Sequence, residues 1–378
     1  MLALFVLALE ALACVRVVLR LAGTAGGTPL GPAIDAAAGT IAAIVPVLDE
    51  EARLGPCLAA LAANRGSLEA IVVVDGGSTD GTCAVVRAAA RHDPRLRLIE
   101  AGPPPSGWNG KAWNLECGLR ALDTDWIVTV DADVRMGPNL IAGAVARASR
   151  DGLAALSVAT RQRLPDAGSA LLHPALLTTL VYRAGLPNVA TARPEAVQAN
   201  GQVFVARRAA LVAADAFRTA RASRCEDVTA ARALAAAGGR VGFYEGDAEV
   251  RMYDSWRACA ANWPRSLTLR DRFTSGARTW TALLELLFAQ ALPLPTLVLI
   301  VAFGSALPAA GIARSVALAL VMVRLGVLAG TRRAYPGVSF AYWLSPLADL
   351  PALALLFRSA LRRRHRWRGR LLVDEGLT

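Results

Sequence analysis

Acidic residues stand at the ends of apolar runs in the first two-thirds of the chain, and their side chains are the ones best suited to chemistry. One run ends in Asp49–Glu51, the next ends at Asp75, and a later one ends in Asp131–Asp133. A fourth group, Cys225–Asp227, opens an alanine-rich stretch of helical spacing. A single aspartate in such a place is usually a turn residue or a helix cap. The information therefore lies in the four groups taken together.

Asp131 and Asp133 are separated by one small residue, Ala132. On an extended chain, side chains two residues apart point to the same side, so these two carboxylates are expected to lie close together. Such a pair repels unless a cation is present, and hard oxygen ligands suit Mg²⁺ or Mn²⁺. The pair predicts a metal site that leaves coordination places for substrate phosphates. The alternative is two turn carboxylates with solvent between them.

The elements around these acids alternate in type. From residue 41 onward, short apolar runs such as AIVVVD alternate with helical stretches such as GTCAVVRAAARH. This alternation predicts βαβ units, and the continuous apolar runs predict strands that are covered on both faces. We therefore expect an α/β fold with a Rossmann-like, mostly parallel sheet and helices on both faces. The carboxyl ends of the strands, with their acids, would meet at the edge where ligands bind.

The composition favours a membrane protein over a nucleic-acid-binding one. The net charge is +11, and 54% of the residues are hydrophobic. No Lys/Arg stripe with interleaved aromatic residues is present, so we expect no nucleic-acid partner. A basic surface toward anionic lipid or toward a diphosphate substrate fits better. The six cysteines form no C-x-x-C pair and the three histidines are dispersed, which argues against a zinc site or a disulfide framework.

Both ends of the chain are apolar. The predicted organisation is an N-terminal membrane anchor at 1–22, a linker at 23–39, a catalytic domain at 40–278, membrane helices at 279–360 and a basic tail at 361–378. Arg16 and Arg20 follow the apolar part of the first segment. Their position predicts that the catalytic domain faces the cytoplasm, and the several apolar segments predict a multi-pass protein of the cell membrane. The first segment could instead lie in the membrane interface.

The later apolar segments lie at about 283–308, 314–330 and 341–357. If these three segments and the N-terminal one all crossed the membrane, the basic tail would lie outside, against the expected charge distribution. We therefore expect at least one of the four segments to be re-entrant or interfacial.

Four motifs occur in order over about 40–275: IVPVLDEE, IVVVDGGSTDGT, GWNGKAWNLECGL with VTVDADVRMGPNL, and CEDVTAARALAAAGG. Their order and spacing resemble those of family 2 glycosyltransferases, which have the GT-A fold. The N-terminal anchor, RMYDSW and the later RWRGR are similar to a membrane branch of that family. That branch includes ceramide glucosyltransferase and the hopanoid- and carotenoid-associated glycosyltransferases, whose acceptors are lipids.

The resemblance implies a binding site for a nucleotide-sugar donor. Pro46, Asp49 and Glu51 match the residues that bind the donor base and ribose. Asp75 matches the acid that reads the nucleobase, and Lys111 matches a lysine near the nucleotide.

The resemblance also implies the residues of the reaction itself. Asp131 matches the first acid of the metal motif, near ribose and sugar, and Asp133 matches the metal ligand. Asp227 matches the general base, with Glu226 beside it. A divalent ion would stabilise the diphosphate leaving group while Asp227 takes the proton of an acceptor hydroxyl.

The sequence departs from the family pattern in two places. Many members carry Q-x-x-R-W after the base, whereas this chain has Asn262-Trp263-Pro264-Arg265, so Trp263 and Arg265 are the candidates for those duties. Trp263 could instead be an aromatic anchor at the membrane interface. The helix after Lys111 carries Asn114 and Glu116 where the family more often shows Ala and Asn.

The predicted function is therefore an inverting, metal-dependent transfer of a sugar from a UDP-sugar to a hydroxyl of a membrane lipid. Inversion is implied by the resemblance alone. An alternative is a polyprenyl-phosphate glycosyltransferase, whose anionic acceptor needs no general base. A second alternative is a membrane scaffold that has the same fold but no catalytic activity.

Overall fold

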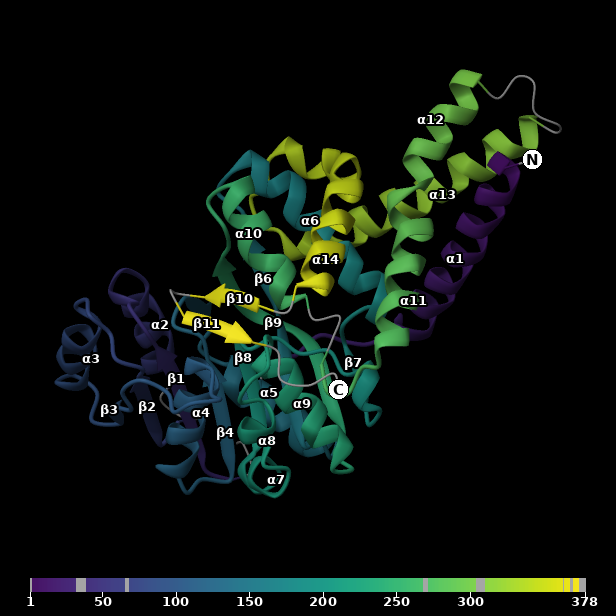
Figure 1. Cartoon of the computed structure of the whole chain (residues 1–378). Helices are drawn as coiled ribbons and strands as arrows, with labels where there is room; N and C mark the ends of the chain where they lie inside the picture. Colours follow the sequence, from purple (N-terminus) through teal and green to yellow (C-terminus); the bar gives the residue numbers. More distant parts are fainter. Residues whose placement is uncertain are drawn as a thin grey trace. The chain divides into compact units, whose positions relative to one another are not determined.

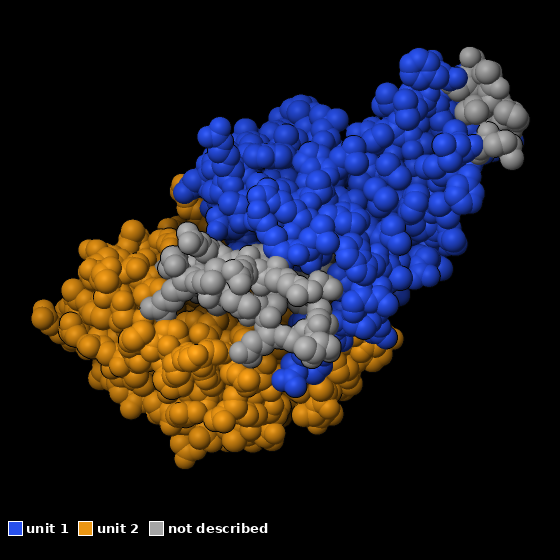
Figure 2. All heavy atoms as spheres, viewed as in Figure 1, with its two compact units in different colours: residues 1–25, 162–186, 252–363 blue, residues 26–161, 187–251, 364–378 orange. Residues whose placement is uncertain are grey.

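The structure is a computed structural model that describes residues 2–31, 39–64, 68–267, 271–303 and 310–362, with the backbone of 364–367 and 370–373. Parts of the predicted linker (32–38) and of the predicted basic tail (363, 368–369 and 374–378) lie outside the described residues. The chain forms two compact units, coloured in Figure 2. Unit 1 comprises residues 1–25, 162–186 and 252–363, and unit 2 comprises residues 26–161, 187–251 and 364–378. Each unit is described by itself.

Unit 2 is built on a mixed sheet (Figure 1). Its strands are β1 Ile41–Val47, β2 Ala70–Asp75, β3 Leu96–Glu100, β4 Trp126–Val130, β5 Val134–Met136, β6 Ala155–Arg163, β7 Val189–Thr191, β8 Val203–Arg207 and β9 Val241–Arg251. Its helices are α2 Glu51–Ala63, α3 Thr82–Ala90, α4 Gly110–Arg120, α5 Leu140–Arg150, α7 Arg208–Ala213, α8 Ala216–Thr219 and α9 Glu226–Ala236. A separate pair, β10 Arg364–Trp367 and β11 Arg370–Val373, is antiparallel.

The strand order is β3-β2-β1-β4-β8-β6-β9-β5, with β7 also paired to β9. The pairs β3/β2, β2/β1 and β1/β4 are parallel, as the βαβ pattern predicted. The pairs β4/β8, β8/β6, β9/β5 and β9/β7 are antiparallel. The predicted α/β fold is confirmed, but its parallel character ends at β4. Strands and helices still alternate from β5 to β7, so the alternation alone did not distinguish these antiparallel pairs, which depend on long-range pairing.

The central strands are covered on both faces. Ala42 and Ile44 of β1 pack in one cluster with Leu115 of α4 and Leu234 of α9. The alternate residues of the same strand, such as Val45, are equally inaccessible to solvent. Because successive side chains point to opposite faces, burial of both sets requires cover on both sides. This explains why the strand sequences read as continuous apolar runs.

Unit 1 consists mainly of helices. They are α1 Leu2–Thr24, α6 Ala167–Ala184, α10 Trp256–Ser266, α11 Gly276–Leu286, α12 Pro293–Phe303, α13 Ala310–Thr331 and α14 Asp349–Leu361. Within this unit, α1, α12 and α13 lie side by side (Figure 1) and share a core that includes Leu7, Ile300 and Ala317. Their outward residues are large and apolar, such as Phe5 and Leu299. Apolar surface of this kind is typical of a membrane-facing bundle.

Three helical stretches of the described residues have the length and apolarity of a membrane span: Leu2–Thr24, Ala310–Ala334 and Phe340–Leu361. They correspond to three of the apolar segments expected from the sequence. The fourth is a pair of helices, Gly276–Ala291 and Pro293–Phe303, with a bend of 45° between them. The bend falls at Pro293, after a π-helical segment Leu287–Ala291, and both features are known causes of helix kinks. The number of crossings stays a prediction.

Candidate active site

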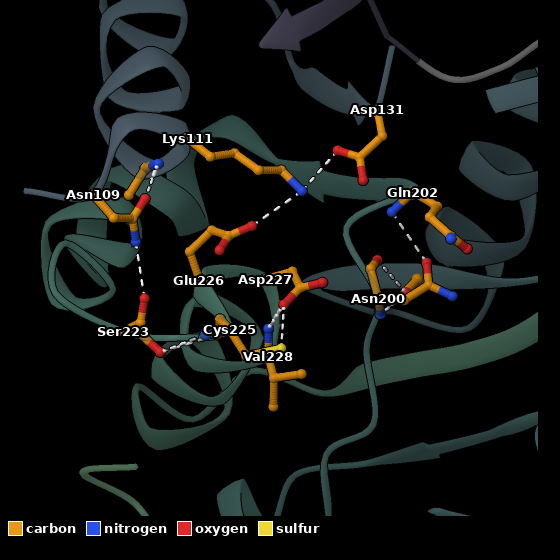
Figure 3. Close-up of polar contacts among 12 residues, drawn as sticks. Asn109, Lys111, Asp131, Asn200, Gln202, Ser223, Cys225, Glu226, Asp227 and Val228 are labelled. Atoms are coloured by element: carbon orange, nitrogen blue, oxygen red, sulfur yellow. Dashed lines mark hydrogen bonds and ion pairs between the residues drawn. The ribbon is translucent and has the colours of Figure 1, made fainter. Parts of the chain in front are cut away.

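Two acids of unit 2, Asp131 and Glu226, meet at the side chain of Lys111, with Asp227 nearby (Figure 3). Lys111, in the first turn of α4, places its Nζ 2.7 Å from Asp131 Oδ1 and 3.0 Å from Glu226 Oε1. Asp131 follows β4 and Glu226 begins α9, so three elements far apart in sequence converge on one ammonium group. Two of the acids that were expected to meet at one sheet edge, Asp131 and Glu226, are thus close together, and Lys111 lies between them.

Lys111 is held in its charged form. Burial alone would lower the pKa of its ammonium group, but the negative charges of Asp131, Glu226 and Asp227 outweigh burial and raise that pKa well above the ordinary value. The helix that carries it begins at Asn109, whose side-chain oxygen accepts a hydrogen bond from the N–H of Ala112 at 2.7 Å. An asparagine cap of this kind fixes the first turn of α4, and with it the root of the lysine.

Asp131 is crowded by other acids. Burial raises the pKa of its carboxyl group to about 7, and the nearby charges of Asp133 and Glu226 add to this rise while Lys111 opposes it. The segment is a turn, since the N–H of Val134 donates to the carbonyl of Asp131 at 3.1 Å. The expectation of two acids on an extended chain was therefore wrong in its geometry. The turn aims Asp131 at Lys111, while Asp133 lies 3.8 Å from Arg53.

Asp131 and Asp133 provide a donor set suited to a divalent ion. Both side chains are only partly exposed, at 29% and 28%, and both are oxygen ligands. Lys111 opposes the rise in the pKa of Asp131 but does not cancel the combined effect of burial and the neighbouring acids. Across the described residues, no three His, Cys, Asp or Glu side chains are grouped as metal ligands. The protein ligands of a metal ion would thus be Asp131 and Asp133. This pair suits Mg²⁺ or Mn²⁺, because these ions bind few protein carboxylates together with substrate phosphates.

Asp227 lies next to this cluster, in the first turn of α9. Facing it is Gly201, in the Asn200–Gln202 loop that precedes β8. A Cβ atom on Gly201 would lie 2.6 Å from Lys111 Nζ and 3.0 Å from Asp227 Oδ2. The loop is joined to the acid turn, because the N–H of Asp131 donates to the carbonyl of Gln202 at 3.1 Å. A larger side chain at position 201 would require Lys111 to shift.

The predicted donor-binding acids interlock the loops that follow β1 and β2. Asp49, with a φ of 53°, accepts from the N–H of Thr79 at 2.8 Å. Glu51 accepts from the N–H of Gly81 at 2.9 Å. Asp75 accepts hydrogen bonds from the backbone of its own loop, including the N–H of Gly77 at 3.0 Å.

These bonds give the three acids a loop-ordering function, and their contacts with a nucleotide stay a prediction. Pro46 lies within β1, opposite Val74 of β2.

The departure from the family pattern at Asn114 has a local physical reason. Its Nδ2 donates to the carbonyls of Val74, at 3.0 Å, and of Val47, at 3.3 Å. The buried amide therefore ties the ends of β1 and β2 together beneath the two loops. Glu116 pairs with Arg120 one turn further along α4, at 2.7 Å.

Trp263 and Arg265 lie in α10 of unit 1. The Trp263 ring stacks on His173 of α6, with ring centroids 3.6 Å apart. His173 is completely buried, and burial holds the pKa of its ring well below the ordinary value. Arg265 Nε donates to the carbonyl of Asn262 at 3.1 Å. Their proposed duties toward diphosphate and acceptor stay predictions.

The sequence reasoning missed several residues of this site, namely Arg53, Asn109, Gly201 and Cys225. Asn109 had a readable signal, since an asparagine ahead of a helical stretch is a common cap. Arg53 and Gly201 had none, because their importance arises from distances between distant segments. Cys225 was named only as the first residue of the fourth acidic group.

Comparison with known proteins agrees with this geometry. Residues 42–204 match the family described as glycosyl transferase family 2. The lipopolysaccharide core biosynthesis glycosyltransferase LpsC of Rhizobium meliloti (strain 1021) is 34% identical over 100 residues, which is 25% of this chain. That match spans 32%, about a third, of the length of LpsC.

The mannosyltransferase PcManGT of Pyrobaculum calidifontis, solved with GDP-Man and Mn²⁺, has a similar fold. Its TM-score is 0.56 at 20% identity, over 94% of this chain and 98% of that one. This likeness concerns the fold. Together with the family match, it confirms the GT-A fold expected from the motifs.

Residues 42–204 thus form a domain similar to family 2 glycosyltransferases, in agreement with the class of enzyme predicted from the motifs.

Proposed function

We propose that this protein is an inverting glycosyltransferase that moves a sugar from a nucleotide sugar, a UDP-sugar, to a hydroxyl group of a membrane lipid. The observation that carries the proposal is the cluster of Lys111, Asp131, Asp133, Glu226 and Asp227 on one side of unit 2. The cluster combines the acid pair Asp131 and Asp133, which suits a metal, with the positive charge of Lys111. It also contains the carboxylate of Asp227, which lies beside Gly201.

The donor would bind along the carboxyl ends of β1, β2 and β4, where ligands of such sheets are held. The interlocked loops around Asp49 and Asp75 would form the nucleoside part of the site. Bound there, Mg²⁺ or Mn²⁺ held by Asp133 and Asp131 would neutralise the charge that develops on the diphosphate leaving group. PcManGT, solved with GDP-Man and Mn²⁺, supports this arrangement by its shared fold.

Lys111 supplies fixed positive charge close to the acid pair. Its ammonium group bridges Asp131 and Glu226, and it would face the departing diphosphate from the protein side. A preorganised cation in a recessed site stabilises developing negative charge more strongly than one in water. Asp227 would accept the proton of the acceptor hydroxyl as that oxygen attacks the anomeric carbon from the face opposite the leaving group.

The lipid acceptor is supported by the apolar helices of unit 1. The candidate spans, and the likeness to a lipopolysaccharide core enzyme, favour a membrane location with several crossings and with unit 2 in the cytoplasm. Arg265 and Trp263 are proposed to serve the diphosphate and the acceptor. The domain limits predicted from the sequence, 40–278 for the catalytic domain and 279–360 for the membrane helices, are kept as part of this proposal.

The test is release of nucleoside diphosphate by the full-length protein in lipid nanodiscs. Nucleotide sugars are supplied one at a time with Mn²⁺ and a total lipid extract, and the product lipid is examined by NMR. We expect a new glycolipid with inverted anomeric configuration. Asp133→Ala and Asp227→Asn should each reduce turnover by about 10² to 10⁴-fold, the range typical of such groups.

Three results would contradict parts of the proposal. A retained anomeric configuration would exclude the single-displacement mechanism. Normal turnover of Asp227→Asn with a polyprenyl phosphate acceptor would favour the alternative acceptor. Binding of neither Mn²⁺ nor any nucleotide sugar, with no effect of Asp133→Ala, would indicate a non-catalytic scaffold.

A further inference from the structure

The two carboxylate oxygens of Asp227 have different surroundings. Oδ1 accepts hydrogen bonds from the N–H of Val228, at 2.7 Å, and from the thiol of Cys225, at 3.0 Å (Figure 3). Oδ2 lies against Gly201, on the side where Lys111 Nζ also approaches that glycine. One oxygen is therefore held by its own chain segment, and the other lies beside Gly201.

We propose that Cys225 is a positioning residue, whose thiol fixes the Asp227 carboxylate so that Oδ2 is presented to the acceptor hydroxyl. The inference rests on the proposed function, in which Asp227 is the general base. No reaction at the sulfur is involved, and the thiol keeps its proton as a hydrogen-bond donor.

The thiol is itself held in place. Cys225 is only 8% exposed, and its backbone N–H donates to Ser223 Oγ at 3.1 Å. Ser223 Oγ also lies 2.7 Å from Thr229 Oγ1 in the second turn of α9. A thiol fixed at its backbone, beside the helix that carries Asp227, is set to orient that carboxylate.

This turn is also tied to the helix that carries Lys111. Asn109 Nδ2 donates to the carbonyl of Ser223 at 3.0 Å, while Asn109 Oδ1 caps α4. Through this one buried amide, the segment that holds Cys225 is fixed to the first turn of α4. The base and the cation are thus positioned by a single connected set of hydrogen bonds.

A short acid side chain can otherwise rotate about its terminal torsion, which has a broad energy profile. A donor on one oxygen restricts that rotation and leaves the other oxygen in a defined direction. Because a thiol is a weak donor, it can orient the carboxylate without withdrawing much of its basicity. Loss of this donor should therefore slow proton removal, which affects kcat, and should leave donor binding unchanged.

The experiment compares Cys225→Ala, which removes the donor, with Cys225→Ser, which keeps one. Both are assayed in the full-length protein in nanodiscs, with kcat and the KM for the nucleotide sugar measured separately. Cys117→Ala, a cysteine of α4 in the same unit, is the matched control. We expect Cys225→Ala to lower kcat about tenfold at unchanged KM, Cys225→Ser to recover most of that loss, and Cys117→Ala to behave as wild type.

A double mutant separates positioning from a general effect on the fold. In the Asp227→Asn background, Cys225→Ala should cause no further loss, because both changes act through the same group. An equal further loss in that background would mean that the thiol acts independently of Asp227 and would overturn the inference. So would a wild-type kcat for Cys225→Ala while Asp227→Asn is inactive, a result that leaves the proposed function intact. Normal turnover of Asp227→Asn itself would overturn both proposals.

Discussion

Arg324 in unit 1 and Lys111 in unit 2 are both largely inaccessible to solvent, but their surroundings differ in charge balance. Arg324 meets one acid, Asp349, in a two-pronged contact of 2.8 and 2.9 Å. Gln290 donates to the same acid at 2.8 Å. Lys111 instead meets Asp131 and Glu226 directly, with Asp227 close by.

The difference separates a structural pair from a binding site. The pair in unit 1 neutralises itself and links α13, α14 and the segment before α12, so it needs no ligand. The cluster in unit 2 gathers several acids around Lys111, and burial, together with the charges of Asp133 and Glu226, raises the pKa of Asp131 to about 7. A group of acids that is short of cations is suited to receive one with its substrate. Four experiments test this difference between the two units.

The largest effect is expected from Asp349→Ala. It leaves Arg324 buried in the helices without its acid, and breaking a buried pair in this way typically costs about 3–5 kcal/mol. The melting temperature of the detergent-solubilised protein should fall clearly, whereas the double change Arg324→Met with Asp349→Leu should restore much of it. If Asp349→Ala melts like the wild type, the pair does not stabilise unit 1.

Lys111→Met should have an intermediate effect on stability and a severe one on turnover. Removing the ammonium group leaves Asp131 and Glu226 without their shared partner, at a cost of about 2 kcal/mol. Because the missing positive charge can be supplied by a metal, Mn²⁺ should stabilise this variant more than the wild type. Melting curves with and without Mn²⁺ measure the difference, and an equal shift in both proteins would count against the charge argument. Lys111→Arg is the control that retains the charge.

The third effect is a pH dependence in unit 2. The pKa of Asp131 in the folded protein, about 7, lies above its ordinary value, so its contribution to stability without metal is greatest at low pH and is lost as pH rises toward and through 7. Mn²⁺ binding requires the ionised acid and should tighten about tenfold from pH 6 to pH 8. Titration calorimetry at these pH values checks this. Asp131→Asn should remove the dependence, and a wild-type affinity that is constant with pH would show that Asp131 is not coupled to the metal.

The smallest effect is expected from Arg16→Gln, which removes the exposed ion pair between Arg16 and Glu285 in unit 1. Arg16 lies 3.0 Å from Glu285, but its side chain is 65% exposed. Pairs of this kind contribute between zero and about 1 kcal/mol, so Arg16→Gln should barely change the melting temperature. A loss as large as that of Asp349→Ala would mean that exposure does not separate the two ion pairs. Arg20→Gln, at a less exposed position beside the same acid, is the informative companion.

Much of this molecule could be predicted from the order of its residues. The apolar runs that end in Asp75 and Asp131 define strands, and their acids were expected at one edge because parallel strands place their carboxyl ends together. The motif order gave the family and the GT-A fold. The apolar helices at both ends were visible from composition alone, since a membrane span needs only a sufficiently long apolar stretch.

Other features depended on the tertiary structure. The turn at Asp131–Asp133 directs the two acids to different cations, and no local spacing rule distinguishes this turn from an extended strand. The antiparallel strands beyond β4 follow from long-range pairing.

Lys111 pairs with Asp131 and Glu226, and Gly201 lies close to Lys111 and Asp227. These contacts join segments that are far apart in sequence. The contact between the Cys225 thiol and Asp227 is local, but it depends on how the chain turns at the start of α9. Sequence determined which groups are available for chemistry. Packing decided their distances, and therefore which acids share Lys111 and which acid is held by the thiol of Cys225.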